Sequence, residues 1–291
     1  MATKRKAAKR SAAAGRRKRS ARASPSRKAG AKRGVTDRVA AMLEAPLAVC
    51  QSDKKLQDTL QVLRDQNQPS RVRLAALQTL QAASFSASAF EPCRGDYIAA
   101  LRAVADDPDP ELRQRVLGIL TNEKDGFAQK KLLDGLQHAE KALVPPEKAL
   151  QLLANDVHAE AYAIARAMVR NPPNPDAKRE ALRLLGADAA AAPLFESVLR
   201  DKDELREIRQ VAASALQALR PEKMRTHARE MLMDKSEYDD IQATSLTALT
   251  QFGGEAVAKD EALLKSVDRL SGAPSAKVKQ SARRFLQKYG R

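Results

Sequence analysis

The stretch DDPDPELRQRVLGIL, residues 106–120, joins an acidic, proline-containing turn to an apolar stretch with basic residues. Asp109-Pro110-Glu111 has the composition of a helix start. Proline lacks the N–H that would be unpaired in the first turn, and the acid complements the helix dipole. DKDELREIRQVAASALQAL (201–219) and APSAKVKQSARRFLQKY (273–289) have a similar pattern. The sequence therefore predicts one structural unit repeated several times.

The repeat is clearest when the second helix of each expected helix pair is aligned. A first apolar column contains Val72, Leu112, Ala177, Ile208, Ile241 and Val278. Four residues later a column of mostly small residues contains Ala76, Val116, Ala181, Ala212, Ser245 and Ala282. Four residues further on lie Leu80, Leu120, Leu185, Leu216, Leu249 and Leu286. The spacing i, i+4, i+8 places each set on one face of a helix.

A weaker seventh member fits at Pro145, Ala149 and Leu153, and successive units then lie 31 to 40 residues apart. A period in this range is typical of solenoids, in which each helix pair buries its apolar face only against its neighbours. We therefore predict an all-α solenoid of about seven antiparallel helix pairs.

The composition agrees with an all-helical core. The 291 residues are 43% hydrophobic, but aromatic residues make up only 3% and tryptophan is absent. The core must consist of leucine, alanine, valine and isoleucine. Alanine and leucine favour helix, and runs of β-branched residues are scarce.

The net charge of +16 is concentrated at the N-terminus. Residues 1–34 contain fourteen of the 52 lysines and arginines and no acid, so residues 35–291 hold 38 bases against 36 acids. Residues 1–34 cannot bury enough apolar surface to fold alone and are expected to be a disordered arm. Residues 35–291 form the expected repeat domain, with Thr36 as the N-cap of its first helix.

The arm is the sharpest functional feature of the sequence. Its basic residues are expected to contact nucleic-acid phosphates without sequence preference, most simply on DNA, because no aromatic residue is present to stack on bases. These residues are Lys4, Arg5, Lys6, Lys9, Arg10, Arg16, Arg17, Lys18, Arg19, Arg22, Arg27, Lys28, Lys32 and Arg33. A nuclear import signal, another targeting signal or a segment that binds acidic membranes remain alternatives.

The turn and columns described above resemble the HEAT repeat, in particular the short form found in bilin-lyase-like HEAT proteins. Asp107, Asp109, Leu112 and Arg113 carry the resemblance best. The arm resembles the tails of linker histones. The HEAT resemblance implies a curved, right-handed superhelix that binds proteins or nucleic acids along its concave face.

A basic row follows the first apolar column. It contains Arg73, Arg113, Lys178, Arg209 and Lys279, with Gln242 at the corresponding position of one repeat. This row has two interpretations. It can form a groove for phosphates, or each base can pair with a turn acid such as Asp107 or Asp203 in a structural ladder, as the HEAT resemblance implies.

The sequence gives no sign of a catalytic, metal or cofactor site. The chain has no HExxH, P-loop, GxGxxG or GxSxG motif. His138 and His158 each lie in HAE, where histidine and glutamate point some 200° apart on a helix. HEAT-like metal-dependent hydroxylases carry several His-Glu dipeptides, and HEAT-like DNA glycosylases use tryptophans in the cleft; this chain has neither. Cys50 and Cys93 are expected to be buried thiols, and no apolar run is long enough for a membrane span.

These observations predict a non-enzymatic scaffold without a cofactor. Its arm would bind nucleic acid, and its solenoid would bind a protein or a duplex. The expected location is the cytoplasm or nucleoid of a bacterium, or the nucleus of a eukaryote. Two alternatives remain: a protein–protein adaptor whose arm is only a targeting signal, and a HEAT-fold enzyme such as a DNA glycosylase-like or bilin-lyase-like protein.

Overall fold

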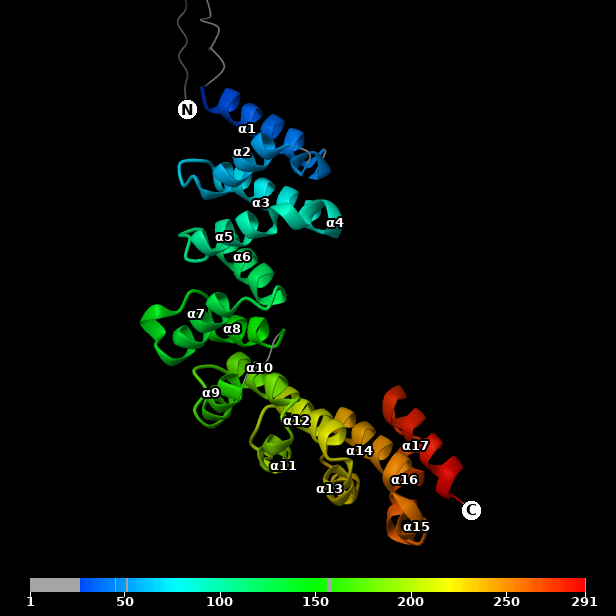
Figure 1. Ribbon diagram of the computed structural model, residues 1–291. Coiled ribbons are helices and arrows are strands. Elements are labelled where there is room, and N and C mark those ends of the chain that lie inside the picture. The colour runs from blue at the N-terminus through cyan, green and yellow to red at the C-terminus, as the bar shows by residue number, and fades with distance from the viewer. Residues whose placement is uncertain (1–26, 45, 51, 156–158, 291) are drawn as a thin grey trace, which may run out of the picture.

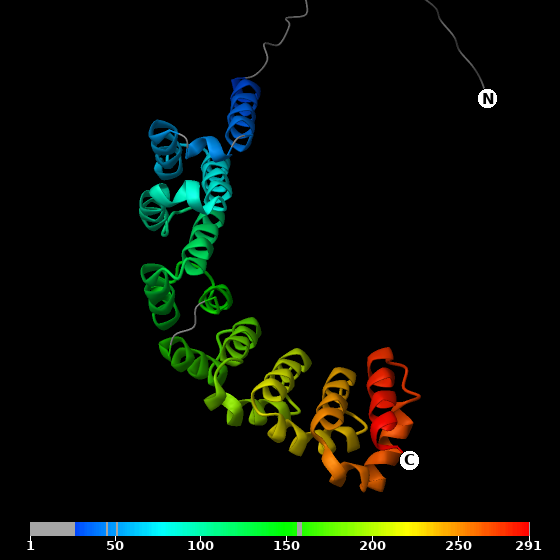
Figure 2. The same cartoon turned by 45° about the vertical axis from the view of Figure 1, so that its right-hand side comes forward.

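The chain folds into an arc of stacked helix pairs (Figures 1 and 2). The computed structural model describes residues 27–44, 46–50, 52–155 and 159–290. Within these ranges the regular structure is entirely helical. The fold class predicted from the sequence, an all-α solenoid, is confirmed.

Seven helix pairs form successive layers of the arc, each with an outer and an inner helix. The outer helices are α2 (Asp53–Arg64), α5 (Arg94–Ala103), α7 (Gly126–Gln137), α9 (Ala159–Arg170), α11 (Ala192–Arg200), α13 (Pro221–Met233) and α16 (Glu261–Leu270). The inner helices are α3 (Ser70–Ser84), α6 (Pro110–Asn122), α8 (Pro146–Leu153), α10 (Pro175–Leu185), α12 (Arg206–Leu219), α14 (Asp239–Phe252) and α17 (Ala276–Tyr289). Figure 2 shows the inner helices side by side along the concave side of the arc.

Short elements and one further helix complete the described chain. α1 (Arg27–Leu43) packs against α3. The short elements are η1 (Pro46–Val49), α4 (Ala87–Phe90), η2 (Glu91–Cys93), η3 (Ala139–Lys141), η4 (Ala189–Ala191) and α15 (Gly254–Ala258). None of the helices in the described ranges combines the length and the apolar character that a membrane span requires.

The first two residue columns predicted from the sequence form the centre of the core. Every member of both columns has at most 2% of its surface exposed. In the third column Leu286 is only half-buried, and in the weaker repeat Pro145 is exposed as the residue before α8. Most residues of the second column are small. They let each inner helix pack closely against the helices around it in one hydrophobic cluster.

The helix start predicted at Asp109 is also confirmed. Asp109 caps α6, its Oδ1 accepting hydrogen bonds from the backbone N–H groups of Glu111 (3.0 Å) and Leu112 (2.9 Å). Asn174 caps α10 in the same way, accepting from the N–H of Ala177 at 2.7 Å. Both caps satisfy donors that the first turn leaves unpaired.

The first helix differs from its prediction. α1 begins at Arg27, upstream of the expected N-cap Thr36, so the boundary drawn between residues 34 and 35 lies inside α1. Alanine, lysine and arginine have high helix propensity, and residues 27–33 consist mostly of these types, which is why the helix extends into the basic segment.

The two cysteines are free thiols. Cys93 is buried and Cys50 is half-buried, which largely confirms the prediction. Burial, together with the neighbouring Cys93 thiol, raises the pKa of Cys50 above its ordinary value.

Ion pairs between outer helices reinforce the stacking. Arg102 of α5 donates to Asp125, the N-cap of α7, at 2.9 and 2.6 Å. Arg229 of α13 donates to Asp260, the N-cap of α16, at 2.6 Å. In both cases one carboxylate caps a helix and also binds a base of the preceding layer.

Replacing the cap of α6 tests the importance of helix starts. Asp109→Ala is expected to lower the free energy of unfolding by about 1 kcal/mol, because two backbone N–H groups lose their acceptor. Asp203→Ala is the control, since Asp203 is exposed and precedes α12 without capping it. Urea unfolding followed by circular dichroism measures both. Equal losses in the two variants would contradict the assignment.

Candidate functional site

Two members of the predicted basic row are buried in bridges between layers. Arg73 of α3 is 3% exposed and donates to the Asp107 carboxylate at 3.1 and 2.5 Å. Arg209 of α12 is 1% exposed and donates to the Glu237 carboxylate at 2.9 and 2.7 Å. Each carboxylate belongs to the following layer. We call these two contacts the arginine bridges.

Each arginine bridge also contacts the outer helix of its own layer. The Nε atom of Arg73 donates to the Leu63 carbonyl, and that of Arg209 donates to the Leu199 carbonyl, both at 2.9 Å. In each case the carbonyl lies ten residues before the arginine. All three nitrogens of the guanidinium therefore have acceptors within the protein, which leaves neither arginine accessible to a phosphate.

The other members of the basic row have different surroundings. Arg113 donates from Nε to the Leu143 carbonyl at 2.5 Å and from Nη1 to the Asp107 carbonyl at 2.6 Å. Lys178 is paired with Glu204. Lys279 lies half-buried on α17 and lines a hollow described below. The structure thus brings Arg73 and Arg113 together at Asp107 and places the remaining members apart.

One expected partner is replaced by another acid. Asp203 was expected to pair with Arg209, but Glu237 takes this position. Glu237 lies in the loop before α14, one layer further on, just as Asp107 lies one layer beyond Arg73. Asp203 is exposed instead, with its own N–H bonded to Asp201 Oδ1 at 3.1 Å.

The charge of Glu237 is stabilised from several directions. Burial by itself would raise the pKa of this carboxyl. The hydrogen bonds from Arg209 and Lys202 and from the Tyr238 backbone N–H outweigh burial, so the pKa lies below its ordinary value. Lys202 Nζ approaches Glu237 Oε2 at 2.6 Å and also binds Asp234 at 2.7 Å.

The basic residues of the predicted arm cannot be placed as a site. Lys4, Arg5, Lys6, Lys9, Arg10, Arg16, Arg17, Lys18, Arg19 and Arg22 lie outside the described residues. Arg27, Lys28, Lys32 and Arg33 lie in the first part of α1.

The concave side of the arc carries a shallow groove that the sequence did not single out. A hollow of about 360 Å³ between α10 and α12 is lined by Leu182, Arg183, Gly186, Gln210, Val211, Ser214 and Ala215. Gln210 Nε2 donates to Ser214 Oγ at 3.2 Å and to Thr244 Oγ1 of α14 at 3.1 Å. The polar contact therefore continues from the hollow to the next inner helix. We call the surface formed by this hollow and the threonines of α14 the inner groove.

The threonines of α14 give the groove a neutral polar surface. Thr244 and Thr247 are half-buried, and their hydroxyl groups donate to the carbonyls of Asp240 and Ala243, each at 2.9 Å. Their remaining lone pairs can accept hydrogen bonds. The sequence pattern did not identify this surface, because the contact between Gln210 and Thr244 depends on how two helices pack together.

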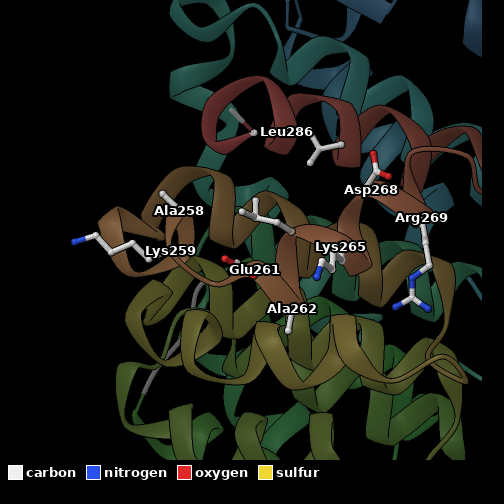
Figure 3. A pocket seen from close by; sticks show the side chains of 10 residues that line it. Ala258, Lys259, Glu261, Ala262, Lys265, Asp268, Arg269 and Leu286 are labelled. Carbon is white, nitrogen blue, oxygen red and sulfur yellow. The ribbon is translucent and has the colours of Figure 1, made fainter.

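A hollow of about 1080 Å³ lies between α15, α16 and the end of α17 (Figure 3). Leu286 points from α17 toward α16, while Lys259 and Arg269 point away at opposite ends. Charges of both signs line it, including Glu261, Lys265 and Asp268. The charged groups do not converge on one point, so this hollow indicates no particular ligand.

The histidines provide no catalytic cluster in the described residues. His227 of α13 bonds Glu196 of α11 at 2.9 Å, and this hydrogen bond lowers the pKa of Glu196. His138 is exposed beside Asp134, and His158 lies outside the described residues. In those ranges no three His, Cys, Asp or Glu side chains are grouped so that they could hold a metal ion.

The chain was compared with protein families, curated proteins and solved structures. No family model matches the chain, and no curated protein matches it. Among solved structures, the chain is similar to that of human deoxyhypusine hydroxylase in complex with glycerol, with a TM-score of 0.36 and 18% identity. The match covers 84% of this chain and 99% of the hydroxylase chain. At this level the similarity assigns no residue and no reaction to the present protein.

The comparison contradicts the function expected from the sequence. A non-enzymatic scaffold whose arm binds nucleic acid was predicted, yet a solved structure to which the chain is similar is that of a hydroxylase. Helical repeats serve enzymes as well as scaffolds, so the repeat and the basic composition could not decide between the two.

The arginine bridges generate a stability prediction. Arg209→Gln is expected to lower the free energy of unfolding by about 3–5 kcal/mol, because it leaves Glu237 buried and without its main partner. Arg206→Gln is the matched control. Arg206 and Arg209 both lie over the Tyr238 ring. The ion pair of Arg206 with Asp240, however, is solvent-exposed and worth about 0–1 kcal/mol. Chemical denaturation of the two variants measures the difference, and similar losses would contradict a buried bridge.

The same bridge predicts a dependence on pH. A carboxyl with a lowered pKa stabilises the folded state above its unfolded pKa, about 4.3 for glutamate, and this contribution is lost as the pH falls through the folded pKa. The stability difference between the wild type and Glu237→Gln should be constant from neutral pH to about pH 5 and should shrink in more acidic solution. Glu255→Gln, at an exposed site, should show no difference at any pH. A difference at Glu237 that persists unchanged into strong acid would contradict the charged bridge.

Proposed function

We propose that the solenoid recognises a polypeptide along its inner helices and that the inner groove holds the main chain of this polypeptide. The polypeptide is the partner of an adaptor or the substrate of a helical-repeat enzyme, since both alternatives require this step. The observation that carries the proposal is the neutral, hydrogen-bonding surface that spans α10, α12 and α14.

The shape of the groove suits an extended chain. Leu182, Val211 and Ala215 give the hollow an apolar part, while Gly186 and Ser214 are small enough to let a main chain approach the helices. A volume of about 360 Å³ is enough for a side chain of the bound polypeptide.

The chemistry of the groove suits peptide groups. Amide and hydroxyl side chains both donate and accept hydrogen bonds, as a peptide main chain does. Gln210 Oε1 is buried and has no hydrogen-bond partner among the described residues. A buried acceptor without a donor is costly, and a peptide N–H that enters the hollow would supply the donor after a small rotation of the amide.

The charge of the groove does not favour phosphates. Arg183 is the one basic side chain that lines the hollow, and it donates to Glu180 at 2.6 Å. Two members of the predicted basic row, Arg73 and Arg209, are buried in the arginine bridges. A ligand in the groove therefore meets nearly neutral polar groups.

Blocking the groove tests the proposal. Twelve-residue peptides selected from a random display library on the full-length protein should bind about tenfold or more weakly to Ser214→Arg, because the long side chain fills the hollow between α10 and α12. Ser197→Arg is the matched control, since Ser197 is also an exposed helical serine but lies on the outer helix α11. Fluorescence anisotropy measures the affinities.

Selected peptides that bind both variants as tightly as the wild type would contradict the inner groove as the binding surface. Failure to enrich any peptide on the wild-type protein would contradict polypeptide recognition itself.

A further inference from the structure

We infer that α17 forms an anion-binding end of the recognition surface and that it takes a run of acidic residues in the bound polypeptide. This inference rests on the proposed function, because it assigns the chemistry of one end of the same ligand. The surface consists of Lys277, Lys279, Gln280, Arg283, Arg284 and Gln287, and we call it the α17 basic surface.

The charge of α17 is uncompensated. The helix contains five bases, Lys277, Lys279, Arg283, Arg284 and Lys288, and no acid. Lys288 donates from Nζ to the Thr250 carbonyl at 2.6 Å. None of the other four forms an ion pair with any of the described residues.

On the neighbouring inner helices α10 and α12, every base is paired with a carboxylate. Arg179 binds Asp176 at 2.8 Å, Arg183 binds Glu180 at 2.6 Å and Arg206 binds Asp240 at 3.1 Å. A base that already has a carboxylate partner attracts an external anion weakly. The unpaired bases of α17 therefore distinguish this helix from its neighbours on the concave side.

The bases of α17 also share one hollow. A depression of about 310 Å³ is lined by Pro274, Ala276, Lys279, Gln280, Arg283, Arg284 and Gln287. Lys279, Arg283 and Gln287 follow one another at intervals of four residues and lie on one helix face, as do Gln280 and Arg284. Two adjacent helix faces thus present three cations and two amides to the same space.

The residues that line the depression favour a carboxylate ligand over nucleobases, because none of them has an aromatic ring. Phe285 is buried, and Tyr289 donates its hydroxyl to the Leu249 carbonyl at 3.2 Å. No aromatic ring lines the depression. Arginine and lysine bind carboxylates through charge-assisted hydrogen bonds, and glutamine can bind the neighbouring peptide groups.

The α17 basic surface is continuous with the inner groove. Gln280, Arg284 and Lys288 lie on one face of α17, and Lys288 contacts α14 directly. Figure 2 shows α10, α12, α14 and α17 as successive inner helices on the concave side. At about 9 Å between packed helices, three steps span about 27 Å, which an extended chain covers with about eight residues. A twelve-residue peptide is long enough to occupy both regions.

The test uses two labelled peptides on the full-length protein. One has four glutamates followed by four Ala-Gln repeats, and the other has glutamine in place of the four glutamates. Lys279→Gln/Arg283→Gln/Arg284→Gln should weaken binding of the glutamate peptide by about tenfold, as expected for the loss of several exposed ion pairs.

The matched control is Lys55→Gln/Arg64→Gln/Arg71→Gln, which removes the same three charges from α2 and α3 at the other end of the arc. It should leave the affinity unchanged, and both triple variants should bind the glutamine peptide as the wild type does. All proteins carry the same N-terminal basic segment, so its contribution cancels. Carbodiimide cross-linking should join peptide carboxylates to Lys277 or Lys279, as mapped by mass spectrometry.

Equal loss of glutamate-peptide binding in the two triple variants, or cross-links that omit α17, would overturn the inference. A random 20-base-pair duplex that binds more tightly than the glutamate peptide, and loses affinity only in the α17 variant, would also overturn it in favour of nucleic acid. Ser214→Arg separates the two proposals. If it leaves the glutamate peptide bound while the α17 variant does not, the inner groove fails and the α17 site stands.

Discussion

The register between layers depends on buried arginines that are neutralised by the following layer. Arg73 and Arg209 each reach a carbonyl of their own outer helix and a carboxylate one layer further on. Apolar packing alone tolerates sliding, because leucine and alanine faces fit one another in several positions. A buried guanidinium does not tolerate it, since any shift that separates it from its carboxylate leaves a charge in the core.

The use of charge inside the protein determines what remains at the surface. Most members of the predicted basic row form ion pairs or hydrogen bonds within the protein. Their partners are Asp107, Glu237, Glu204 and backbone carbonyls. The concave side over α10, α12 and α14 is consequently close to neutral, and unpaired positive charge appears on α17. Recognition along this side would therefore change in character from hydrogen bonding in the middle of the surface to electrostatic attraction at α17.

The sequence predicted the repeat well because burial has a period. The buried positions of Val72, Ala76 and Leu80 have counterparts in most other layers, at intervals that place them on one face of a helix. The helix start at Asp109 could also be predicted, because the hydrogen bonds of a cap are local. The partner of Arg209 could not be predicted from the sequence. The conformations of the loops before α12 and α14 decide whether Asp203 or Glu237 turns inward. The candidate surface was missed for a related reason: Gln210 and Thr244 are ordinary residues until two helices bring them together.

The layered construction also determines how the protein can open locally. Each layer contacts mainly its neighbours, so a seam between two layers can open without the whole chain unfolding. A ligand that lies across α10, α12, α14 and α17 would cross three seams at once and would have to be released, at least in part, before any of them opened. Occupancy of the concave side would therefore appear as slower amide hydrogen exchange in helices that the ligand never touches, and the same seams would transmit the presence of the ligand to the outer surface.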